Sequence, residues 1–429
     1  MHSSPAAPEK PFASQAWHRL FIGACLAILL SGAAARLVLP DGDTEDQPGP
    51  FAGLFASLPE AWRTWRASPT TLAANRVLEQ GIDAFERRLE ESSHLRALPP
   101  AHLLLAAVGA PANDNIYAGR DRWLFLRGGF DYLTGPPFLD PVALERRQRA
   151  APAWRPAPQL DPRPAIIDFH RQLEARGIHL IVFLAPTKPM VHPEPLAPEL
   201  TDDPGDTALH NPSFAEFRTD LEQHGITVFE PSAVLSAQRR ATGSEQYLRA
   251  DSHWSPEGLD AAARALADEI ARLDLPFTGS SVTWRRRPAE VTGTGDLRHS
   301  LTLPGRPQLY LPETVQVQRV VSRRGQPWQL DKRAEILLLG DSFTNIYSET
   351  SDEWGRSAGL AEQLSFYLER PLDRIAIDGG GEAATRRRLA QEIASGRDRL
   401  ATKKLVIWQT AIRTLAFRDW PLIEIGGSG

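Results

Sequence analysis

Short apolar runs alternate with amphipathic stretches from residue 165 to the end of the chain. Several runs are almost continuously apolar, which is typical of strands buried on both faces of a parallel sheet. The stretches between them carry apolar residues at helical spacing, and Gly177 and Gly225 follow two of them as stop signals. Repeated helix and strand predict an α/β fold with a mainly parallel sheet. We expect strands at 179–185, 226–229, 314–322, 336–339, 374–377 and 404–409, and helices at 166–176, 213–224, 256–273, 357–368 and 382–395, the third of them with Ser255 as its N-cap.

The N-terminal part of the chain has a different pattern. Basic residues up to Arg19 precede an apolar run at 20–39, which only Arg36 interrupts. This length lies between a signal-peptide core and a full span of about 20 residues. We therefore expect 1–40 to be an uncleaved signal anchor, with a cleaved signal peptide as the alternative, because 31–35 offers small residues to a peptidase. Positive charge before the run places the rest of the chain outside the cytoplasm.

Two further segments separate this run from the α/β region. Residues 41–114 begin with an acidic, Gly- and Pro-containing linker and continue as a helical lead-in. Residues 115–126 place short apolar segments on either side of a Gly-x-Asp turn, which predicts a hairpin. We therefore expect the catalytic domain to cover 115–429.

Candidate chemistry is found where the strand at 336–339 ends. Gly340-Asp341-Ser342 follows it directly, so Ser342 is expected at the carboxyl edge of the sheet, where open α/β folds place ligands. A serine nucleophile needs a base and an acid that orients the base. Asp251 and His253 supply both on one loop, since residues two apart in an extended segment point the same way. Taken alone, this pair could equally be turn and cap residues.

Other candidate groups carry weaker signals. Gly380 and Gly381 could offer backbone amides to an oxyanion, or could form a flexible turn. Asp296 and His299 could form a rival acid–base pair, or belong to a plain loop. The turn Gly-Asp-Ser-Phe-Thr is not the Gly-x-Ser-x-Gly elbow of α/β-hydrolases.

Composition narrows the function classes. The 429 residues are 42% hydrophobic and 24% charged, enough for a buried core. The net charge of -5 argues against a nucleic-acid binder. Cys25 is the only cysteine, so thiolate metal sites and disulfides are excluded, and no His-Glu-x-x-His spacing occurs. We expect no metal and no other cofactor.

The motifs together resemble a known family. Gly340-Asp341-Ser342 is similar to the first block of SGNH hydrolases, but the block at 251–254, Asp-x-His-Trp, precedes it. That permuted order resembles the alginate O-acetyltransferases of the AlgJ and AlgX type. The hairpin at 115–126, Pro186-x-Lys188, Gly295-Asp296-Leu297 and a last strand followed by Arg413 are similar too. Gln409 departs from the acidic residue expected in that last strand.

The resemblance implies a flattened α/β/α sandwich and acetyl transfer to an exported exopolysaccharide. Ser342 would be the nucleophile, His253 the base and Asp251 the orienting acid. A membrane-bound O-acyltransferase would supply the acetyl group across the inner membrane, and this domain would lie in the periplasm, held through 20–39.

Two other functions stay open: an acetylesterase with the same residues, and a non-catalytic polysaccharide-binding component. The residues proposed to contact substrate are Arg413 and the aromatic pair Trp254 and Tyr347, which could stack on sugars, although aromatic residues more often belong to a core.

Overall fold

The computed structural model describes residues 111–113, 115–150, 158–196, 209–301, 310–348 and 353–426. Contacts divide the chain after Leu104, and all described residues belong to the unit Leu105–Gly429. The expected signal segment at 1–40 and most of the lead-in at 41–114 lie outside the described residues. Within the described ranges, no helix combines the length and the apolar character that a membrane crossing requires.

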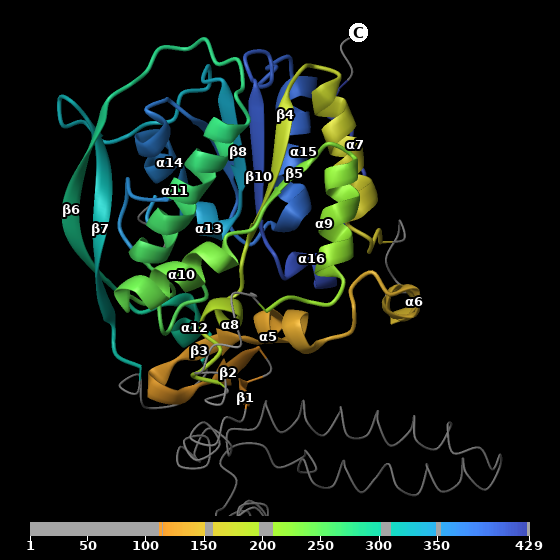
Figure 1. The fold of residues 1–429 in the computed structure, drawn as a ribbon, viewed down its shortest axis with the longest axis vertical. Coiled ribbons are helices and arrows are strands. Elements are labelled where there is room, and N and C mark those ends of the chain that lie inside the picture. Colours follow the sequence, from red (N-terminus) through yellow and green to blue (C-terminus); the bar gives the residue numbers. More distant parts are fainter. Residues whose placement is uncertain are drawn as a thin grey trace, which may run out of the picture. The chain divides into compact units, whose positions relative to one another are not determined.

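Five parallel strands form the central sheet, in the order β5-β4-β10-β8-β9 (Figure 1). Every residue of β8 and β10 is buried, as expected for strands covered on both faces. This confirms the predicted parallel α/β sheet. The strands are β4 (His179–Ala185), β5 (Thr227–Phe229), β8 (Ile336–Gly340), β9 (Asp373–Ala376) and β10 (Leu405–Ala411).

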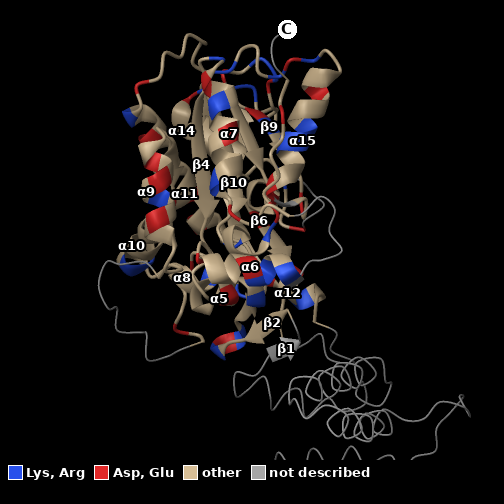
Figure 2. Cartoon of the chain, turned by 90° about the vertical axis from the view of Figure 1, so that its right-hand side faces the viewer, with Lys and Arg blue, Asp and Glu red and all other residues tan. Residues whose placement is uncertain are grey.

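Helices cover both faces of this sheet (Figure 1). On one face, α11 (Pro256–Arg272) packs beside α14 (Leu360–Leu368). The other face is covered by α7 (Arg163–Glu174), α9 (Phe214–Gln223) and α15 (Gly381–Ala394). Figure 2 shows charged residues along the outer sides of α9 and α15, while the strands between the helices are largely uncharged.

Helix α11 begins where the sequence predicts. The hydroxyl of Ser255 accepts the backbone N–H of Gly258 at 3.1 Å, and Pro256 occupies the first turn. The sequence does not predict the four-residue helices, because about one turn is too short to show a periodicity: α8 (Lys188–Val191), α12 (Asp296–His299), α13 (Ser342–Asn345) and α16 (Thr414–Phe417). It also does not predict the longer α5 (Arg127–Thr134), α6 (Pro141–Ala150) and α10 (Ser232–Thr242).

The predicted hairpin is confirmed. Strand β2 (Ile116–Ala118) pairs antiparallel with β3 (Leu124–Leu126), and β1 (Pro111–Asn113) adds a third strand. Buried Lys188, at the end of β4, donates to the carbonyl oxygens of Leu124 at 2.7 Å and Arg249 at 3.1 Å. The hairpin is thereby joined to the segment that leads to Asp251.

A separate two-stranded ribbon packs outside α11 and α14 (Figure 1). It consists of β6 (Trp284–Gly293) and β7 (Glu313–Ser322), paired antiparallel along their whole length. The glycines at 293 and 295 lead us to expect a loop over 292–301, and the structure corrects this: 292 and 293 end β6, and 296–299 form α12. The sequence hides β6, because three consecutive arginines and Pro288 interrupt the alternation typical of a strand.

Candidate active site

The structure brings Ser342, His253 and Asp251 into one hydrogen-bonded chain. Ser342 begins α13 directly after β8 and remains partly exposed. His253 Nε2 lies 2.7 Å from Ser342 Oγ, and His253 Nδ1 lies 2.7 Å from Asp251 Oδ1. The imidazole can therefore hold its proton on Nδ1 and accept the serine proton on Nε2. This geometry is suited to activating a serine hydroxyl as a nucleophile.

Asp251 is buried, and four N–H donors surround its carboxylate. Oδ1 accepts the backbone N–H of His253 at 3.0 Å in addition to the imidazole. Oδ2 accepts the indole N–H of Trp354 at 2.9 Å and the backbone N–H of Asp296 at 3.1 Å. A buried carboxylate that is fully satisfied in this way has a fixed orientation. The acid in turn fixes the plane of the His253 ring.

The charges of this pair favour each other. Burial alone would lower the pKa of His253, but the negative charge of Asp251 and their hydrogen bond outweigh burial and raise that pKa to about 9. Burial opposes the anionic form of Asp251, yet the His253 charge and the hydrogen bonds from His253 and Trp354 hold its pKa well below the usual range. His253 is therefore a strong base whose neutral fraction grows with rising pH.

A second carboxylate, Asp341, fixes the turn that carries the serine. Its Oδ1 accepts the backbone N–H of Phe343 and the side-chain N–H of Gln409, each at 2.9 Å, and its Oδ2 accepts the backbone N–H of Ala411 at 2.9 Å. Gln409 Oε1 accepts the Asp341 N–H at 3.1 Å. A glutamate at 409 could not donate to this carboxylate, so the observed glutamine suits the network as a neutral donor and acceptor.

Gly340 allows the turn to close tightly on itself. A Cβ at this position would lie 2.1 Å from Thr344 Oγ1, a separation that no side chain tolerates. The N–H of Ser342, at the start of α13, has no acceptor among the described residues. It is therefore available to an oxyanion that forms on an acyl group attached to Ser342.

Gly380 and Gly381 lie at the start of α15, after β9, which neighbours β8. The turn before them contacts α13, because Asn345 Nδ2 donates to Asp378 Oδ1 at 2.8 Å. The Gly380 N–H donates to the Ile377 carbonyl at 3.4 Å. This hydrogen bond is long and therefore weak, so the N–H could donate to an oxyanion instead. Their role as oxyanion donors stays a prediction.

The proposed sugar contacts of Trp254 and Tyr347 are corrected by their burial. Trp254 is 0% exposed and Tyr347 1% exposed, so neither ring offers a face to a sugar. Trp254 meets the Phe343 ring edge-on at 5.0 Å. Tyr347 adopts a left-handed φ of 68° and donates its hydroxyl to the Trp254 carbonyl at 2.9 Å. Both residues therefore help to hold the loop that carries His253 in place.

Arg413 lies beside the site, at the end of β10. Its guanidinium is 5.8 Å above the ring of Phe343, the residue after Ser342. It makes no hydrogen bond or ion pair with any described residue. Burial lowers the pKa of Arg413, while the negative charges of Asp341 and Asp296 oppose this effect. A cation next to the nucleophile with no carboxylate bound to it is suited to an anionic group of a substrate.

The rival pair of Asp296 and His299 does not form. Asp296 instead accepts the backbone N–H and the hydroxyl of Ser252, each at 2.6 Å. His299 Nε2 lies 2.5 Å from the hydroxyl of Thr294. Gly295, with φ of 85°, permits this arrangement, because a Cβ there would lie 2.3 Å from the Ala250 carbonyl oxygen. Asp296 thus secures the loop that carries Asp251 and His253.

Ligand atoms of Asp251, His253 and Asp296 lie within 4.8 Å of one another, a spacing that a metal ion could bridge. These groups already form hydrogen bonds within the protein: Asp251 and His253 bond each other, and Asp296 bonds Ser252.

Trp354 is a supporting residue of the site that the sequence does not predict. It lies 103 positions from Asp251, and nothing in its local sequence marks it as a partner.

Comparisons with known proteins agree with this site. The family described as SGNH hydrolase-like domain, acetyltransferase AlgX, matches residues 116–412, which include Asp251, His253 and Ser342. The probable alginate O-acetylase AlgJ of Pseudomonas putida is 23% identical over 313 residues, covering 71% of each chain. The corresponding Pseudomonas aeruginosa protein is 26% identical over 274 residues, covering 61% of this chain and 66% of that protein.

A solved structure shares the fold. The O-acetyltransferase domain of Pseudomonas putida AlgJ matches with a TM-score of 0.52 at 22% identity, covering 71% of this chain and 93% of that domain. The resemblance inferred from the permuted motifs is thereby confirmed. This chain belongs to the AlgX acetyltransferase family of SGNH hydrolase-like domains.

Proposed function

We propose that this protein transfers acetyl groups, through an acetyl ester on Ser342, to hydroxyls of an exported polyuronate such as alginate. The observation that carries the proposal is the chain of hydrogen bonds from Asp251 through His253 to the partly exposed Ser342. Family membership and the alginate O-acetylase names of the relatives support the reaction and the acceptor.

The first half-reaction acetylates the serine. Ser342 Oγ attacks the acetyl carbonyl of the donor while His253 Nε2 takes the hydroxyl proton. The negative charge on the carbonyl oxygen is stabilised by the Ser342 N–H. The tetrahedral intermediate collapses, the donor's leaving group takes the proton from His253, and the acetyl group remains on Ser342 as an ester. The Asp251 carboxylate stabilises the imidazolium throughout.

The second half-reaction reverses these roles. A sugar hydroxyl gives its proton to His253 Nε2 and attacks the acetyl carbon. The Ser342–acetyl bond then breaks, and His253 returns the proton to Ser342 Oγ. Arg413 is suited to orient the acceptor by binding a uronate carboxylate, because its guanidinium lies next to Phe343 without a carboxylate partner among the described residues. Transfer requires the sugar hydroxyl to react faster than water.

The acetyl content of the polymer tests this proposal. Ser342→Ala should abolish polymer acetylation in cells that depend on this protein, while Ser280→Ala, at an exposed serine on the surface, should leave it unchanged. Unchanged acetylation with the Ser342 variant at normal protein levels would refute the transferase. Increased acetylation would identify an acetylesterase with the same residues. Complete loss of the polymer in the Ser342 variant would instead indicate a non-catalytic role in polymer assembly.

The membrane context is part of the proposal. We infer that the segment 20–39 holds the protein to the inner membrane, with the catalytic domain in the periplasm. A membrane-bound O-acyltransferase then delivers the acetyl group across that membrane. The basic residues up to Arg19 and the apolar run after them support this orientation. Membrane fractionation of the full chain and of a chain lacking 20–39 tests it, since only the full chain should sediment with membranes.

A further inference from the structure

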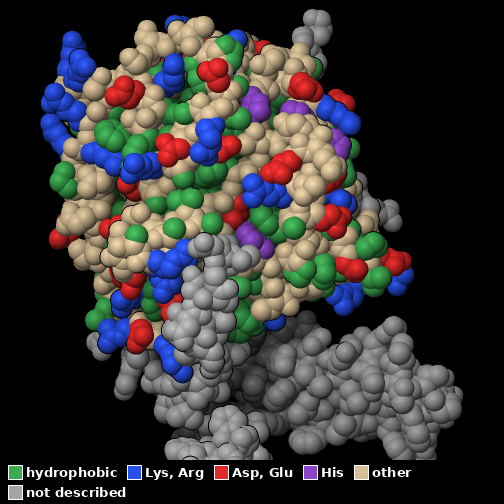
Figure 3. All heavy atoms as spheres, in the orientation of Figure 1, with side chains coloured by type: hydrophobic (Ala, Val, Ile, Leu, Met, Phe, Trp, Pro, Cys, Tyr) green, Lys and Arg blue, Asp and Glu red, His purple; other side chains and the backbone are tan. Residues whose placement is uncertain are grey.

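The β6–β7 ribbon carries a cluster of positive charge that the catalytic mechanism does not use. Arg287 on β6 is the direct cross-strand partner of Arg319 on β7, and Arg285 lies two positions before Arg287. The tight turn after β7 adds Arg323 and Arg324. Figure 3 shows Lys and Arg side chains gathered at the upper left of the molecule, over the upper part of this ribbon. We call these five arginines the ribbon cluster.

The ribbon cluster lacks carboxylate partners. None of its arginines makes an ion pair with a residue that the structure describes. Arg323 donates to the Thr283 hydroxyl at 2.9 Å, and the Nε of Arg319 is buried without any hydrogen-bond partner. Like charges directly opposite each other destabilise a sheet. Such an arrangement in a chain of net charge -5 indicates a surface that meets an anion.

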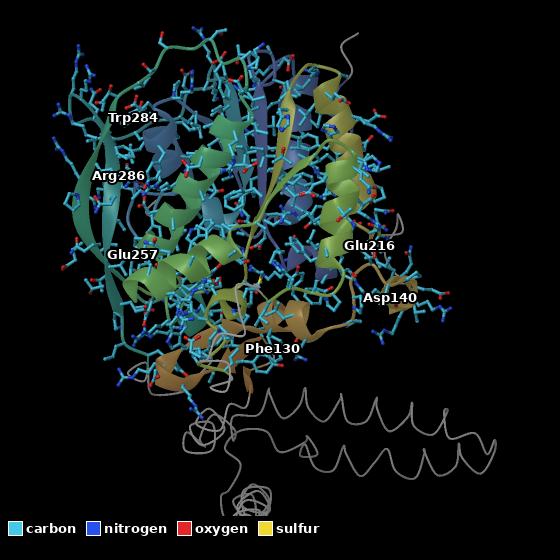
Figure 4. All side chains as sticks on the ribbon, viewed as in Figure 1. Phe130, Asp140, Glu216, Glu257, Trp284 and Arg286 are labelled. Atoms are coloured by element: carbon cyan, nitrogen blue, oxygen red, sulfur yellow. The ribbon has the colours of Figure 1, made fainter. Side chains whose placement is uncertain are left out.

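The neighbouring Arg286 shows what an ordinary structural arginine does here. It turns to the other side of β6, pairs with Asp260 of α11, and stacks 4.1 Å from the Phe366 ring. Figure 4 labels Arg286 and Trp284 in the upper part of the ribbon. Arg285 and Arg287 alternate with it and are exposed, so they face away from α11 and α14.

The ribbon connects the cluster to the active site. Strand β6 continues from Arg287 to Gly293, a length of about 20 Å at the usual rise of a strand. Asp296 follows and bonds both Ser252 and Asp251. Between the two ends, the ribbon presents the hydroxyls of Thr292 and Thr314, which lie 2.8 Å apart, and the carboxylate of Glu290, which accepts the side-chain N–H of Gln316 at 3.3 Å. The five arginines of the ribbon cluster outnumber this carboxylate, and together with the hydroxyl groups they are suited to a long polar chain with repeated carboxylates.

We propose that the outer face of the β6–β7 ribbon is a second binding surface for the polyanionic acceptor, which holds the polymer while its hydroxyls reach Ser342. The inference rests on the proposed function for the identity of the acceptor. A polyuronate carries one carboxylate on every sugar and therefore complements several arginines at once. Because the charges are exposed, the attraction is long-ranged and weakens with salt.

Binding of a purified oligouronate to the full-length protein tests this surface. The double variant Arg285→Gln/Arg287→Gln should weaken binding about fivefold at low salt. The difference should shrink at high salt, and Arg285→Lys/Arg287→Lys should restore most of the affinity. The matched control Arg171→Gln/Arg397→Gln removes two exposed arginines from α7 and the loop after α15, and should bind like wild type. Hydrolysis of a small acetyl ester should be unchanged in all four proteins, which shows that each is folded.

Two results would overturn the proposal. One is unchanged oligouronate affinity in the Arg285→Gln/Arg287→Gln variant at low salt. The other is a variant that loses binding to vesicles of anionic phospholipid but keeps its oligouronate affinity, since the ribbon would then face a membrane. Failure of the proposed function is a separate result: a wild-type protein that never acetylates the oligouronate refutes the transferase, while the binding measurement still decides the role of the ribbon.

Discussion

Two aspartates support the candidate nucleophile, and their surroundings differ in one respect: Asp251 is linked to Ser342 through His253, and Asp341 directly precedes Ser342. Both carboxylates are held by several N–H donors. Asp251 also bonds an imidazole, a group that can gain and lose a proton. All hydrogen bonds to Asp341 come from neutral groups, namely two backbone amides and the Gln409 side chain.

Asp251 therefore takes part in the chemistry, whereas Asp341 holds the structure of the turn. The Asp251 charge changes the proton affinity of His253, and so acts on the reaction through another residue. The Asp341 charge has no titrating hydrogen-bond partner, so its hydrogen bonds determine the shape of the turn between β8 and α13. A carboxylate close to a nucleophile is therefore not by itself a member of the catalytic group; the protonation chemistry of its partners decides its role.

The largest expected effect comes from replacing the two aspartates in turn. Asp251→Asn should lower the acetyl-ester turnover by about 10⁴-fold, because the amide cannot hold the His253 tautomer that accepts the serine proton. Asp341→Asn should mainly lower stability, by about 1–3 kcal/mol, because a donor of the turn loses its acceptor. Steady-state kinetics and denaturant unfolding of both variants measure the two effects. Equal losses of turnover at equal stability would remove the distinction.

The pH dependence of turnover tests whether the Asp251 charge acts on the protonation of His253. His253 must be neutral to accept the serine proton, and its pKa is raised to about 9 by Asp251. The kcat/KM for a small acetyl ester should therefore increase about tenfold per pH unit below this pKa and level off above it. In Asp251→Asn the increase should move to lower pH, because the negative charge is gone. A wild-type profile that is flat between neutral and alkaline pH would contradict the assignment of His253 as base.

Gln409→Glu tests the neutrality of the Asp341 surroundings. A second carboxylate beside the Asp341 carboxylate removes a donor and adds repulsion, with an expected loss of about 3 kcal/mol at neutral pH. Protonation of one carboxyl group relieves the repulsion, so this loss should shrink as the pH falls. Gln409→Met removes the same donor and also the acceptor of the Asp341 N–H and of the Thr344 hydroxyl, but it adds no charge, so its loss should be independent of pH. A Gln409→Glu loss that does not vary with pH would show that the charge is irrelevant.

The sequence predicts the buried part of the fold well. Strands such as β4 and β10 are apolar at nearly every position because both faces are covered, and their expected limits differ from the structure by at most two residues. The ribbon strand β6 was missed, since its arginines and Pro288 mask the alternation. Four-residue helices such as α13 carry no periodic signal, although α13 positions the nucleophile.

Residues of the site were predictable only where chain position determines side-chain direction. Ser342 follows a buried strand, which places it at the edge of the sheet, and Asp251 and His253 point the same way because they are two apart on one loop. The contact between this loop, which lies between α10 and α11, and the turn after β8 is tertiary and is not determined by the local sequence. Trp254 directly follows His253 and Tyr347 lies five positions after Ser342, yet both point into the core. Proximity along the chain does not determine direction when the chain turns, and a left-handed residue such as Tyr347 is not evident from its neighbours.

Trp354 provides the smallest and most specific change to the Asp251 surroundings. Trp354→Phe removes one donor to the Asp251 carboxylate and keeps an aromatic ring in the core. A hydrogen bond to a charged group contributes roughly 1.5–3 kcal/mol, and the variant loses this contribution. We expect part of the loss to appear as a roughly tenfold lower kcat, because Asp251 holds His253 less firmly. Kinetics at a pH above the His253 pKa measure this effect without interference from titration.

Trp328→Phe is the matched control for this change. Trp328 is also buried, and its indole N–H donates at 2.9 Å, the same length as in Trp354, but to the hydroxyl of Ser365. Both variants lose an indole donor and part of a buried ring, so both should be less stable. Only Trp354→Phe should lower kcat. A similar decrease in kcat for both variants would mean that the loss follows general loosening of the core, and that the donors to Asp251 contribute to stability alone.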